Sequence, residues 1–445
     1  MRTLLAVVSA VLFCGSPAFQ DEIKKLIDDL KSSEIEKREA AQKKLLELGE
    51  KAEPALEAAL KETTDLEVRG RLHKVLDVLK MKAVFKGFLK GREKRDGASK
   101  ESDAAVRRAL GWLARHQAKD GSWGAVDYTE RCKKDGCKPN PGEETYTLAV
   151  TAMSVCAFLG AGHTPLSKEK EGDLVFGDVV KAGLEWIVKR QGGDGSFDHR
   201  TMKYMYGEAW ATLAVVEAAS MVKESPWQEP AQLAVGAIEA AQNPNSGWRY
   251  SSRCGDSDTS VTMNCLQALA VAKMGGFAVR DAAINGGRAW FDSVTDQAGK
   301  AGYTHKGTGK VFMPGKNENF DHHETLAMGA GFARALTGSK ADDLAAVVDL
   351  AANDRPAWDE NKRDYYYWYW GTLALFQVEG AKGDGWKKWN AAVEKALVDN
   401  QETGGCKDGS WGPGDRWSSE GGRIYATAMN ALTLETPYRY GRVTK

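Results

Sequence analysis

The sequence predicts an all-α protein: an α/α toroid of six helical hairpins, with twelve helices in an inner and an outer ring, preceded by a small N-terminal helical module. Three observations lead to this prediction. Apolar residues follow helical spacing over residues 21–80. A turn containing Gln, Gly and an aromatic residue recurs from residue 104 onward. The segments that follow these turns are rich in Ala and Gly on all sides, as helices of a buried inner ring would be.

The composition excludes several classes of protein. Lys+Arg and Asp+Glu are both 61, so the chain has no basic surplus for nucleic acid, and we expect no nucleic-acid partner. The chain is rich in Gly and Trp, with 47 Gly and 14 Trp among its 445 residues. Its apolar fraction of 42% is ordinary for a globular protein. Collagen, extended disorder and a polytopic membrane protein are therefore excluded.

The first residues have the pattern of a secretory signal peptide. An apolar run covers Leu4–Phe13, and Ser16 to Ala18 form a small-x-small cleavage pattern. The run is too short to span a membrane. We therefore expect residues 1–18 to be removed and the protein to be exported, to the periplasm or the medium.

Six cysteines remain after this cleavage. Cys132 and Cys137 lie in a polar loop, RCKKDGCKP, and in an oxidising compartment this spacing favours a small-loop disulfide over a metal site. Cys156 and Cys265 lie in apolar helical runs and are expected to be buried as small hydrophobic residues.

Residues 21–80 form the predicted N-terminal module. Four bursts of helical periodicity predict two helical hairpins, and the stretch IEKREAAQKKLLELGEKAEPALEAAL resembles HEAT-type repeats. Residues 81–103 follow as a basic linker, and eight Lys or Arg lie between residues 80 and 100. This charge indicates either a solvated helix end and linker or a contact of residues 80–100 with a membrane surface or polyanion, without a transmembrane segment.

The repeats that follow have a measurable spacing. The recurring stretches are RALGWLARHQAKDGSWG (108–124), KAGLEWIVKRQGGDGSFD (181–198), AQNPNSGWRY (241–250) and QETGGCKDGSWG (401–412). Gln117, Gln191, Gln242 and Gln401 are 74, 51 and 159 residues apart, and 159 is three times 53. The spacing predicts two further, degenerate units near residues 295 and 348.

Each unit has the same predicted anatomy. An outer helix ends in Gln, a Gly supplies a positive φ at the turn, and the aromatic residue after it packs back on the helix end. The Gln side chain is expected to bond the exposed backbone groups of the turn. A second, inner helix of small and apolar residues follows, which gives six helical pairs.

These units resemble the QW repeats of squalene cyclases. The resemblance places residues 104–437 in the terpenoid cyclase and protein prenyltransferase superfamily of α/α toroids, with residues 438–445 as a tail. The same ring carries cyclases, prenyltransferases, polysaccharide lyases and thioester domains, so the resemblance implies the fold more strongly than the chemistry. The residues that match are Arg108-Ala109, Trp112-Leu113, Gln117, Gly121 and Trp123 in one repeat, and Lys181-Ala182, Trp186-Ile187, Gln191, Gly195 and Phe197 in the next.

In such a ring the N-terminal ends of the inner helices converge on a central cavity. Acidic, imidazole and aromatic residues gather at these positions, which is unusual for a purely structural rim. The structural alternative is that Asp256, Asp258 and Thr259 cap helices and that the aromatic residues belong to the core. The residues predicted to line the cavity are Tyr206, Glu208, Tyr366, Tyr369, Trp370 and Tyr425.

The candidate catalytic residues are Asp258, His323 and Arg423, and each comes from a precedent in the superfamily. The squalene cyclases use an Asp-x-Asp-Asp tetrad whose third residue is the acid. Residues 256–259 keep Asp at positions one and three but carry Thr259 at position four, and an alignment on the downstream Ala-Leu pair puts Ser260 at the acid position. A polysaccharide lyase would use Arg423 with the Asp and His cluster on a uronate substrate.

A metal site is the third possibility. Protein prenyltransferases hold zinc through Asp, Cys and His, and in this chain the corresponding set is Asp256, Asp258, His322 and His323. Because the Cys ligand is replaced by Asp or Ser, the resemblance implies at most one divalent ion of changed identity, calcium, manganese or zinc.

The sequence therefore favours an exported repeat protein that binds a ligand or partner in its central cavity without the standard cyclase or prenyltransferase residues. The partner would be a hydrophobic small molecule, a polysaccharide or a protein. The alternative is an enzyme of the same fold, either a terpenoid cyclase or a metal-assisted polysaccharide lyase.

Overall fold

The computed structural model describes residues 17–89, 92, 97–128, 132, 136–197, 204–222, 224–244, 246–308 and 313–444. The chain divides into two compact units, Met1–Lys86 and Gly87–Lys445. The predicted signal peptide lies outside the described residues except for Pro17 and Ala18, where the first helix begins.

In the first unit, the described residues from Pro17 onward form four helices with a core of their own. Leu30, Leu45, Leu56 and Leu72 are fully buried in this core, which explains the helical spacing of the apolar residues. The two predicted hairpins are present, and the fourth helix continues into residues predicted as linker. The helices are α1 (Pro17–Asp29), α2 (Ile35–Leu48), α3 (Glu53–Glu62) and α4 (Leu66–Leu89), with a short 3₁₀ turn (Gly49–Ala52) before α3.

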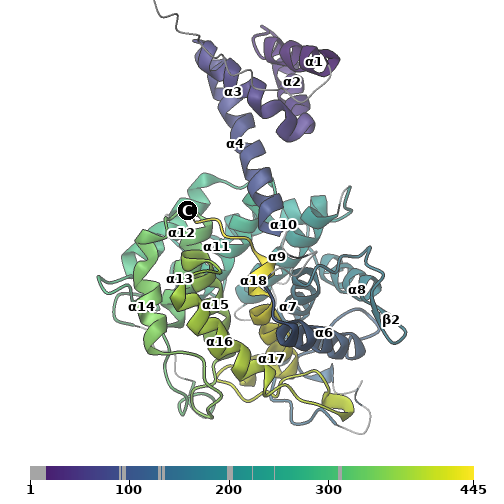
Figure 1. Cartoon of the computed structure of the whole chain (residues 1–445), viewed down its shortest axis with the longest axis vertical. Coiled ribbons are helices and arrows are strands. Elements are labelled where there is room, and N and C mark those ends of the chain that lie inside the picture. Colours follow the sequence, from purple (N-terminus) through teal and green to yellow (C-terminus); the bar gives the residue numbers. More distant parts are fainter. Residues whose placement is uncertain are drawn as a thin grey trace, which may run out of the picture. The chain divides into compact units, whose positions relative to one another are not determined.

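The second unit is a closed double ring of helices (Figure 1). Each inner helix contacts the next inner helix, and α17 packs back on α7, so the ring closes. The outer helices are α6 (Lys100–Arg115), α8 (Phe176–Lys189), α10 (Gln228–Ala241), α12 (Asp281–Val294), α14 (Ala345–Asn353) and α16 (Asp384–Val398). The inner helices are α7 (Thr147–Gly160), α9 (Met205–Met221), α11 (Thr259–Met274), α13 (Thr325–Leu336), α15 (Tyr365–Glu379) and α17 (Ser418–Leu434). This arrangement confirms the predicted six-hairpin toroid, and α12 and α14 occupy the two degenerate units.

Short elements complete the unit. A two-stranded ribbon of β1 (Lys170–Glu171) and β2 (Leu174–Val175) lies in the loop before α8. Single 3₁₀ turns occur at Glu144–Tyr146, Asp342–Leu344 and Gly405–Lys407, and α18 (Thr436–Arg439) follows α17. No helix among the described residues is both long enough and apolar enough to cross a bilayer.

The Gln side chains join neighbouring hairpins in the predicted way. Gln117 Nε2 donates to Gly121 O in its own turn and to Val179 O in the next outer helix, both at 2.9 Å. Gln191 and Gln242 make the same pair of bonds to their own turns and to the next outer helices. Gln401 in the last repeat donates to Ala105 O of α6, so the same bond closes the ring.

The Trp residues of the turns bond the ends of the outer helices at the same junctions between hairpins. The indole Nε1 of Trp123 donates to Leu113 O at 2.8 Å, and Trp248 and Trp411 donate in the same way to the ends of α10 and α16. The glycine before Trp123 is Gly121, with φ of 97°, where a Cβ would meet Ala182 O at 2.2 Å. Only glycine permits this approach of the turn to the next outer helix.

The two ends of the toroid segment pack together at the C-terminal ends of the inner helices. Arg92, predicted to lie in a solvated linker, is 1% exposed, and its Nη1 bonds Glu217 Oε2 at 3.0 Å. Arg439 and Tyr440, both predicted to lie in the tail 438–445, are also buried and contact the same Glu217. Residues 438–440 are therefore part of the folded ring.

Candidate functional site

A cavity of about 160 Å³ lies at the N-terminal ends of the inner helices. Its wall combines aromatic and aliphatic side chains with a few charged groups. The lining residues with aromatic rings are Tyr146, Tyr206, Trp210, Tyr250, Tyr303, Tyr366, Trp417, Tyr425, His322 and His323, and the others are Ala149, Val150, Met153, Ser260, Met313, Thr325, Leu326, Asp364, Arg416, Glu420 and Gly421.

The structure places three of the six predicted lining residues, Tyr206, Tyr366 and Tyr425, on this wall. The other three are buried elsewhere. Glu208 accepts a bond from Phe197 N at 2.9 Å and so serves the turn of the second repeat. Tyr369 and Trp370 lie about one helical turn deeper than Tyr366. Tyr369 bonds Gln267 and Arg439, whereas Trp370 packs on Phe332.

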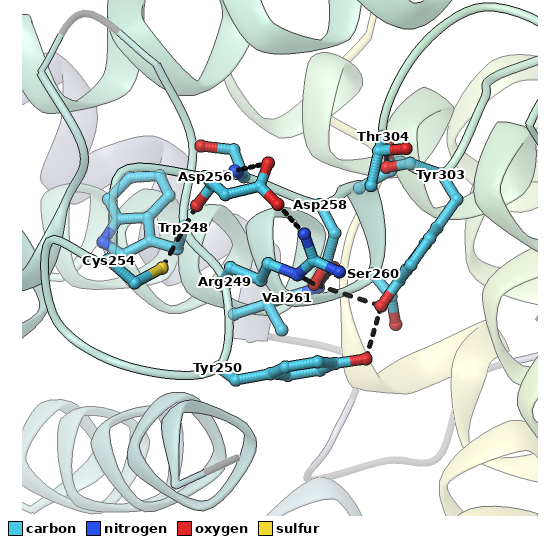
Figure 2. A network of polar contacts seen from close by, with 12 residues as sticks. Trp248, Arg249, Tyr250, Cys254, Asp256, Asp258, Ser260, Val261, Tyr303 and Thr304 are labelled. Atoms are coloured by element: carbon cyan, nitrogen blue, oxygen red, sulfur yellow. Dashed lines mark hydrogen bonds and ion pairs between the residues drawn. The ribbon is translucent and has the colours of Figure 1, made fainter. Parts of the chain in front are cut away.

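Asp258 is connected to the cavity through two tyrosines (Figure 2). It is the N-cap of α11, where its Oδ1 accepts from Val261 N at 2.8 Å. Tyr303 OH donates to Asp258 Oδ2 at 3.3 Å, and the hydroxyls of Tyr303 and Tyr250 are 2.5 Å apart. Burial raises the pKa of Asp258 to about 6, against the opposing effects of the Val261 N–H and the Arg249 charge. A fully buried carboxyl group is therefore hydrogen-bonded to a tyrosine of the cavity wall.

The predicted metal set of Asp256, Asp258, His322 and His323 is not assembled. Asp256 pairs with Arg249 at the surface, whereas Asp258 is occupied by its capping bond. In the described part of the chain, the ligand atoms of these four residues do not gather into a group that could hold an ion.

The two histidines have other partners. His323 pairs through Nδ1 with Asp354, and its Nε2 lies 3.1 Å from Lys362 O. Burial lowers the pKa of His323, but Asp354 and the charge of Asp364 outweigh it, so the pKa is raised overall. His322 Nδ1 lies 3.1 Å from Arg416 Nη2. Both histidines line the cavity as neighbours of charged groups.

Two buried carboxyl groups that the sequence analysis missed lie beside the cavity. Asp364 lines it, caps α15 through Tyr367 N at 2.8 Å and accepts from Trp417 Nε1 at 3.2 Å. Asp415 accepts from Tyr365 N at 3.0 Å. Burial raises the pKa of both groups, and the nearby charge of Asp364 helps to raise that of Asp415 to about 7.

The repeat spacing contains a signal for one of these residues. Asp364 lies 106 residues after Asp258, which is twice the 53-residue repeat, and both carboxylates cap inner helices in the same way. An N-cap Asp at matching positions of two repeats could therefore have been expected.

Charged residues mark the solvent side of the cavity. Glu420, on the wall, pairs with Lys316 at 2.9 Å, and Lys316 also pairs with Glu143 at 2.5 Å. The Lys316 side chain is 37% exposed. Arg416 donates to Phe320 O at 3.1 Å and faces the ring of Trp417.

Arg423, predicted as a catalytic residue, is not among the lining residues. The chain kinks at Gly422, with φ of 64°, and the guanidinium of Arg423 is held outside the cavity. Its Nε donates to Cys137 O at 3.3 Å, and its Nη1 donates to Ser410 Oγ at 3.0 Å.

The predicted disulfide between Cys132 and Cys137 is also absent. Both thiols are free, and together with Cys406 and His116 they form a group of side chains that could hold a metal ion. Cys156 and Cys265 are buried, as predicted.

Comparisons with known proteins add a likeness of fold. No protein-family model and no curated protein matches the chain. Among solved structures, the chain is similar to a variant of the type II terpene cyclase MstE from Scytonema in complex with its substrate, geranylgeranyl dihydroxybenzoate. The identity is 12% and the TM-score 0.49, over 76% of this chain and 97% of that chain.

Proposed function

We propose that the toroid binds an apolar small molecule of the isoprenoid type in its central cavity. The observation that supports this function is the wall itself, which combines tyrosine and tryptophan rings with Val150, Met153 and Leu326. Burial of an apolar chain against such a wall contributes about 25 cal/mol per Å². Aromatic faces also pack well on the unsaturated hydrocarbon chain of an isoprenoid.

The charged side of the cavity suits a ligand with one polar end. Arg416 and His322 lie together, and Glu420 carries the ion pair with Lys316. A hydroxyl or other hydrogen-bonding head group placed here would keep its partners while the apolar chain is buried. A ligand loses affinity when its polar group is bound without hydrogen-bonding partners that replace water.

Export is part of this proposal. The apolar run Leu4–Phe13 and the small-x-small pattern that follows it support removal of residues 1–18. The protein would then meet its ligand outside the cytoplasm. Mass spectrometry of the mature chain, expressed with its own N-terminus, should find a new N-terminus close to residue 19.

Binding can be tested with prenyl alcohols of increasing length, geraniol, farnesol and geranylgeraniol, through quenching of tryptophan fluorescence. Ala149→Trp should fill the cavity and weaken binding of the best probe by about tenfold or more. Leu166→Trp is the matched control, because Leu166 is 67% exposed and is not among the lining residues. Equal affinity of the two variants would contradict a ligand site in the cavity.

A second candidate function is proton-initiated cyclisation of such a ligand. It is favoured by carboxyl groups whose pKa is raised at the wall, Asp364 directly and Asp258 through Tyr303. A protonated acid beside an apolar cavity can donate to a carbon–carbon double bond, and aromatic faces then stabilise the cation. The lyase alternative loses support, because Arg423 is held outside the cavity.

Product analysis distinguishes binding from catalysis. The protein would be incubated with the prenyl alcohols and with a geranylgeranylated phenol, and extracts would be analysed by gas chromatography. A cyclic product that disappears in Asp364→Asn or Asp258→Asn, but not in Asp256→Asn, would establish catalysis. Recovery of intact ligand from all four proteins would leave binding as the function.

A further inference from the structure

A group of three cysteines and one histidine lies at the junction of the first and last repeats, outside the ligand cavity. His116 ends α6, Cys132 and Cys137 follow in the next loop, and Cys406 lies in the turn before α17. The four ligand atoms all lie within 4.8 Å of one another. Cys406 is 290 residues from His116 in sequence, so only closure of the ring assembles the group.

We propose that these residues, His116, Cys132, Cys137 and Cys406, bind one structural Zn²⁺ that fastens the two ends of the toroid. The distances fit a tetrahedral ion. His116 Nε2 is 3.5, 3.5 and 3.4 Å from the sulfur atoms of Cys132, Cys137 and Cys406. Zn–S bonds of about 2.3 Å and a Zn–N bond of about 2.0 Å imply tetrahedral N···S edges of about 3.5 Å.

The histidine is oriented as a metal ligand. Its Nδ1 lies 2.8 Å from Trp112 O, so this nitrogen carries the proton and donates. The lone pair of Nε2 is then directed at the three sulfur atoms. A ring N–H bonded to a backbone carbonyl is the usual support of a zinc-bound histidine. The ring is also fixed by stacking on Trp112, at 4.1 Å between centroids.

Neighbouring charges favour a thiolate site. Three thiolates and one Zn²⁺ leave one net negative charge. The buried guanidinium of Arg423 bonds Cys137 O, and both Arg115 and Arg423 act on the His116 ring through their charge. The site therefore gives a role to Arg423 that the cavity does not.

The ligand set indicates a structural site. Four protein ligands complete a tetrahedron and leave no open position for water or substrate, in contrast to catalytic zinc. Three sulfur ligands favour zinc over calcium or manganese. Around the site, Trp112 Nε1 donates to Cys406 O at 2.9 Å and Arg115 donates to Asp408 O at 2.8 Å, so first and last repeats already meet here.

Elemental analysis tests this inference. The full-length protein, purified without chelator, should contain one zinc per chain. Alkylation mapping should find that the three cysteines form no disulfide and that they react with the reagent only after the zinc is removed. Replacement by Co²⁺ should give the visible absorption of tetrahedral cobalt bound to thiolates.

Two variants and a control assign the site. Cys406→Ser should lose most of the zinc and the cobalt spectrum, and its Tm should fall by about 5 °C or more. Cys406→His, which keeps a ligand, should retain the metal. Cys254→Ser is the matched control, because Cys254 is an exposed thiol outside the group.

Three outcomes would overturn the proposal. One is metal-free protein with Cys132 and Cys137 joined in a disulfide, and another is unchanged zinc content in Cys406→Ser. The third outcome applies if Cys406→Ser does not fold. The zinc content and thiol state of the unmodified protein then decide the question, and a protein without bound zinc would overturn the proposal.

Discussion

Buried carboxyl groups occur at both ends of the inner ring, and their surroundings are opposite. At the C-terminal ends of the inner helices, Glu217 is fully buried between Arg92 and Arg439. Burial raises its pKa, but the two guanidinium groups outweigh this and lower it overall. At the N-terminal ends, Asp415 is bonded by the neutral donors Tyr365 N and Tyr425 OH, and burial raises its pKa to about 7.

The difference separates a structural end, where the buried carboxyl group has a lowered pKa, from the cavity end, where the pKa of buried carboxyl groups is raised. Two arginines keep Glu217 ionised, so the group fastens residues from the start and the end of the toroid to α9. A carboxyl group that remains protonated near neutral pH costs little to bury but can give up its proton. The end of the ring that carries the cavity is therefore the end where a buried carboxyl group changes its charge near neutral pH.

The largest expected effect is at the structural end. Glu217→Gln would leave Arg92 and Arg439 buried without their counter-charge, and we expect a loss of about 3–5 kcal/mol in the free energy of unfolding. Urea unfolding followed by circular dichroism measures it. Asp292→Asn is the control, because Asp292 pairs with Arg334 at the surface and should contribute about 1 kcal/mol or less. Similar losses in both variants would refute the distinction between the two ends.

The second effect is the pH dependence of stability. Because the folded-state pKa of Asp415 is raised from 3.8 to about 7, the folded chain keeps a proton that the unfolded chain has released. The free energy of unfolding should therefore fall as pH rises from about 4 to about 7, by up to about 4 kcal/mol from this group. Glu217, whose pKa is lowered, acts in the opposite direction and loses its contribution as pH falls.

Asp415→Asn should remove this dependence. The measurement is urea unfolding of both proteins over the same pH series. The contributions of groups that do not interact with Asp415 cancel in the difference, whereas Asp364, whose charge acts on Asp415, contributes to it. Parallel curves for the variant and the unmodified protein would show that Asp415 ionises normally.

A smaller effect is expected for the tyrosine at the structural end. Tyr440 OH donates to Glu217 Oε1, and hydrogen bonds to a charged group are stronger than neutral ones. Tyr440→Phe should destabilise the protein by about 1.5–3 kcal/mol, again measured by urea unfolding. A loss below about 0.5 kcal/mol would mean that the arginines alone hold Glu217.

The smallest effect belongs to the tyrosine at the cavity end. Tyr425 OH donates to Asp415 Oδ2 at 3.3 Å, so Tyr425→Phe removes one donor to the ionised form. We expect a change of about 1 kcal/mol or less at pH 5, where Asp415 is protonated, and an upward shift of its titration by about half a pH unit. The pH series above, repeated with this variant, measures both the change in stability and the shift of the Asp415 titration. A shift of that titration to lower pH would contradict the assignment of Tyr425 as donor.

Much of the fold was predictable because its signals are local and repeated. The spacing of Gln117, Gln191, Gln242 and Gln401 measures a structural unit, and each Gln makes its bonds within its own turn and to the next outer helix. The Ala- and Gly-rich helices could be assigned to the inner ring because small residues on all sides permit close packing. Closure of the ring follows from the number of units.

The candidate site was predictable only in part, because position in a repeat does not fix the direction of a side chain. Tyr206, Tyr366 and Tyr425 reach the cavity, whereas the neighbouring Tyr369 reaches Arg439. A kink at Gly422 directs Arg423 away from the cavity.

The sequence by itself determined a helical repeat protein and its six units, because these depend on periodicity and short-range bonds. The end of the ring where the cavity lies was implied by the resemblance to the α/α toroids. Only the tertiary structure decided which polar groups meet. Asp258 met Tyr303, and Cys406 met His116 across 290 residues. The physical reason is that contacts between distant segments depend on where a closed ring brings its ends together, and no local pattern records that position.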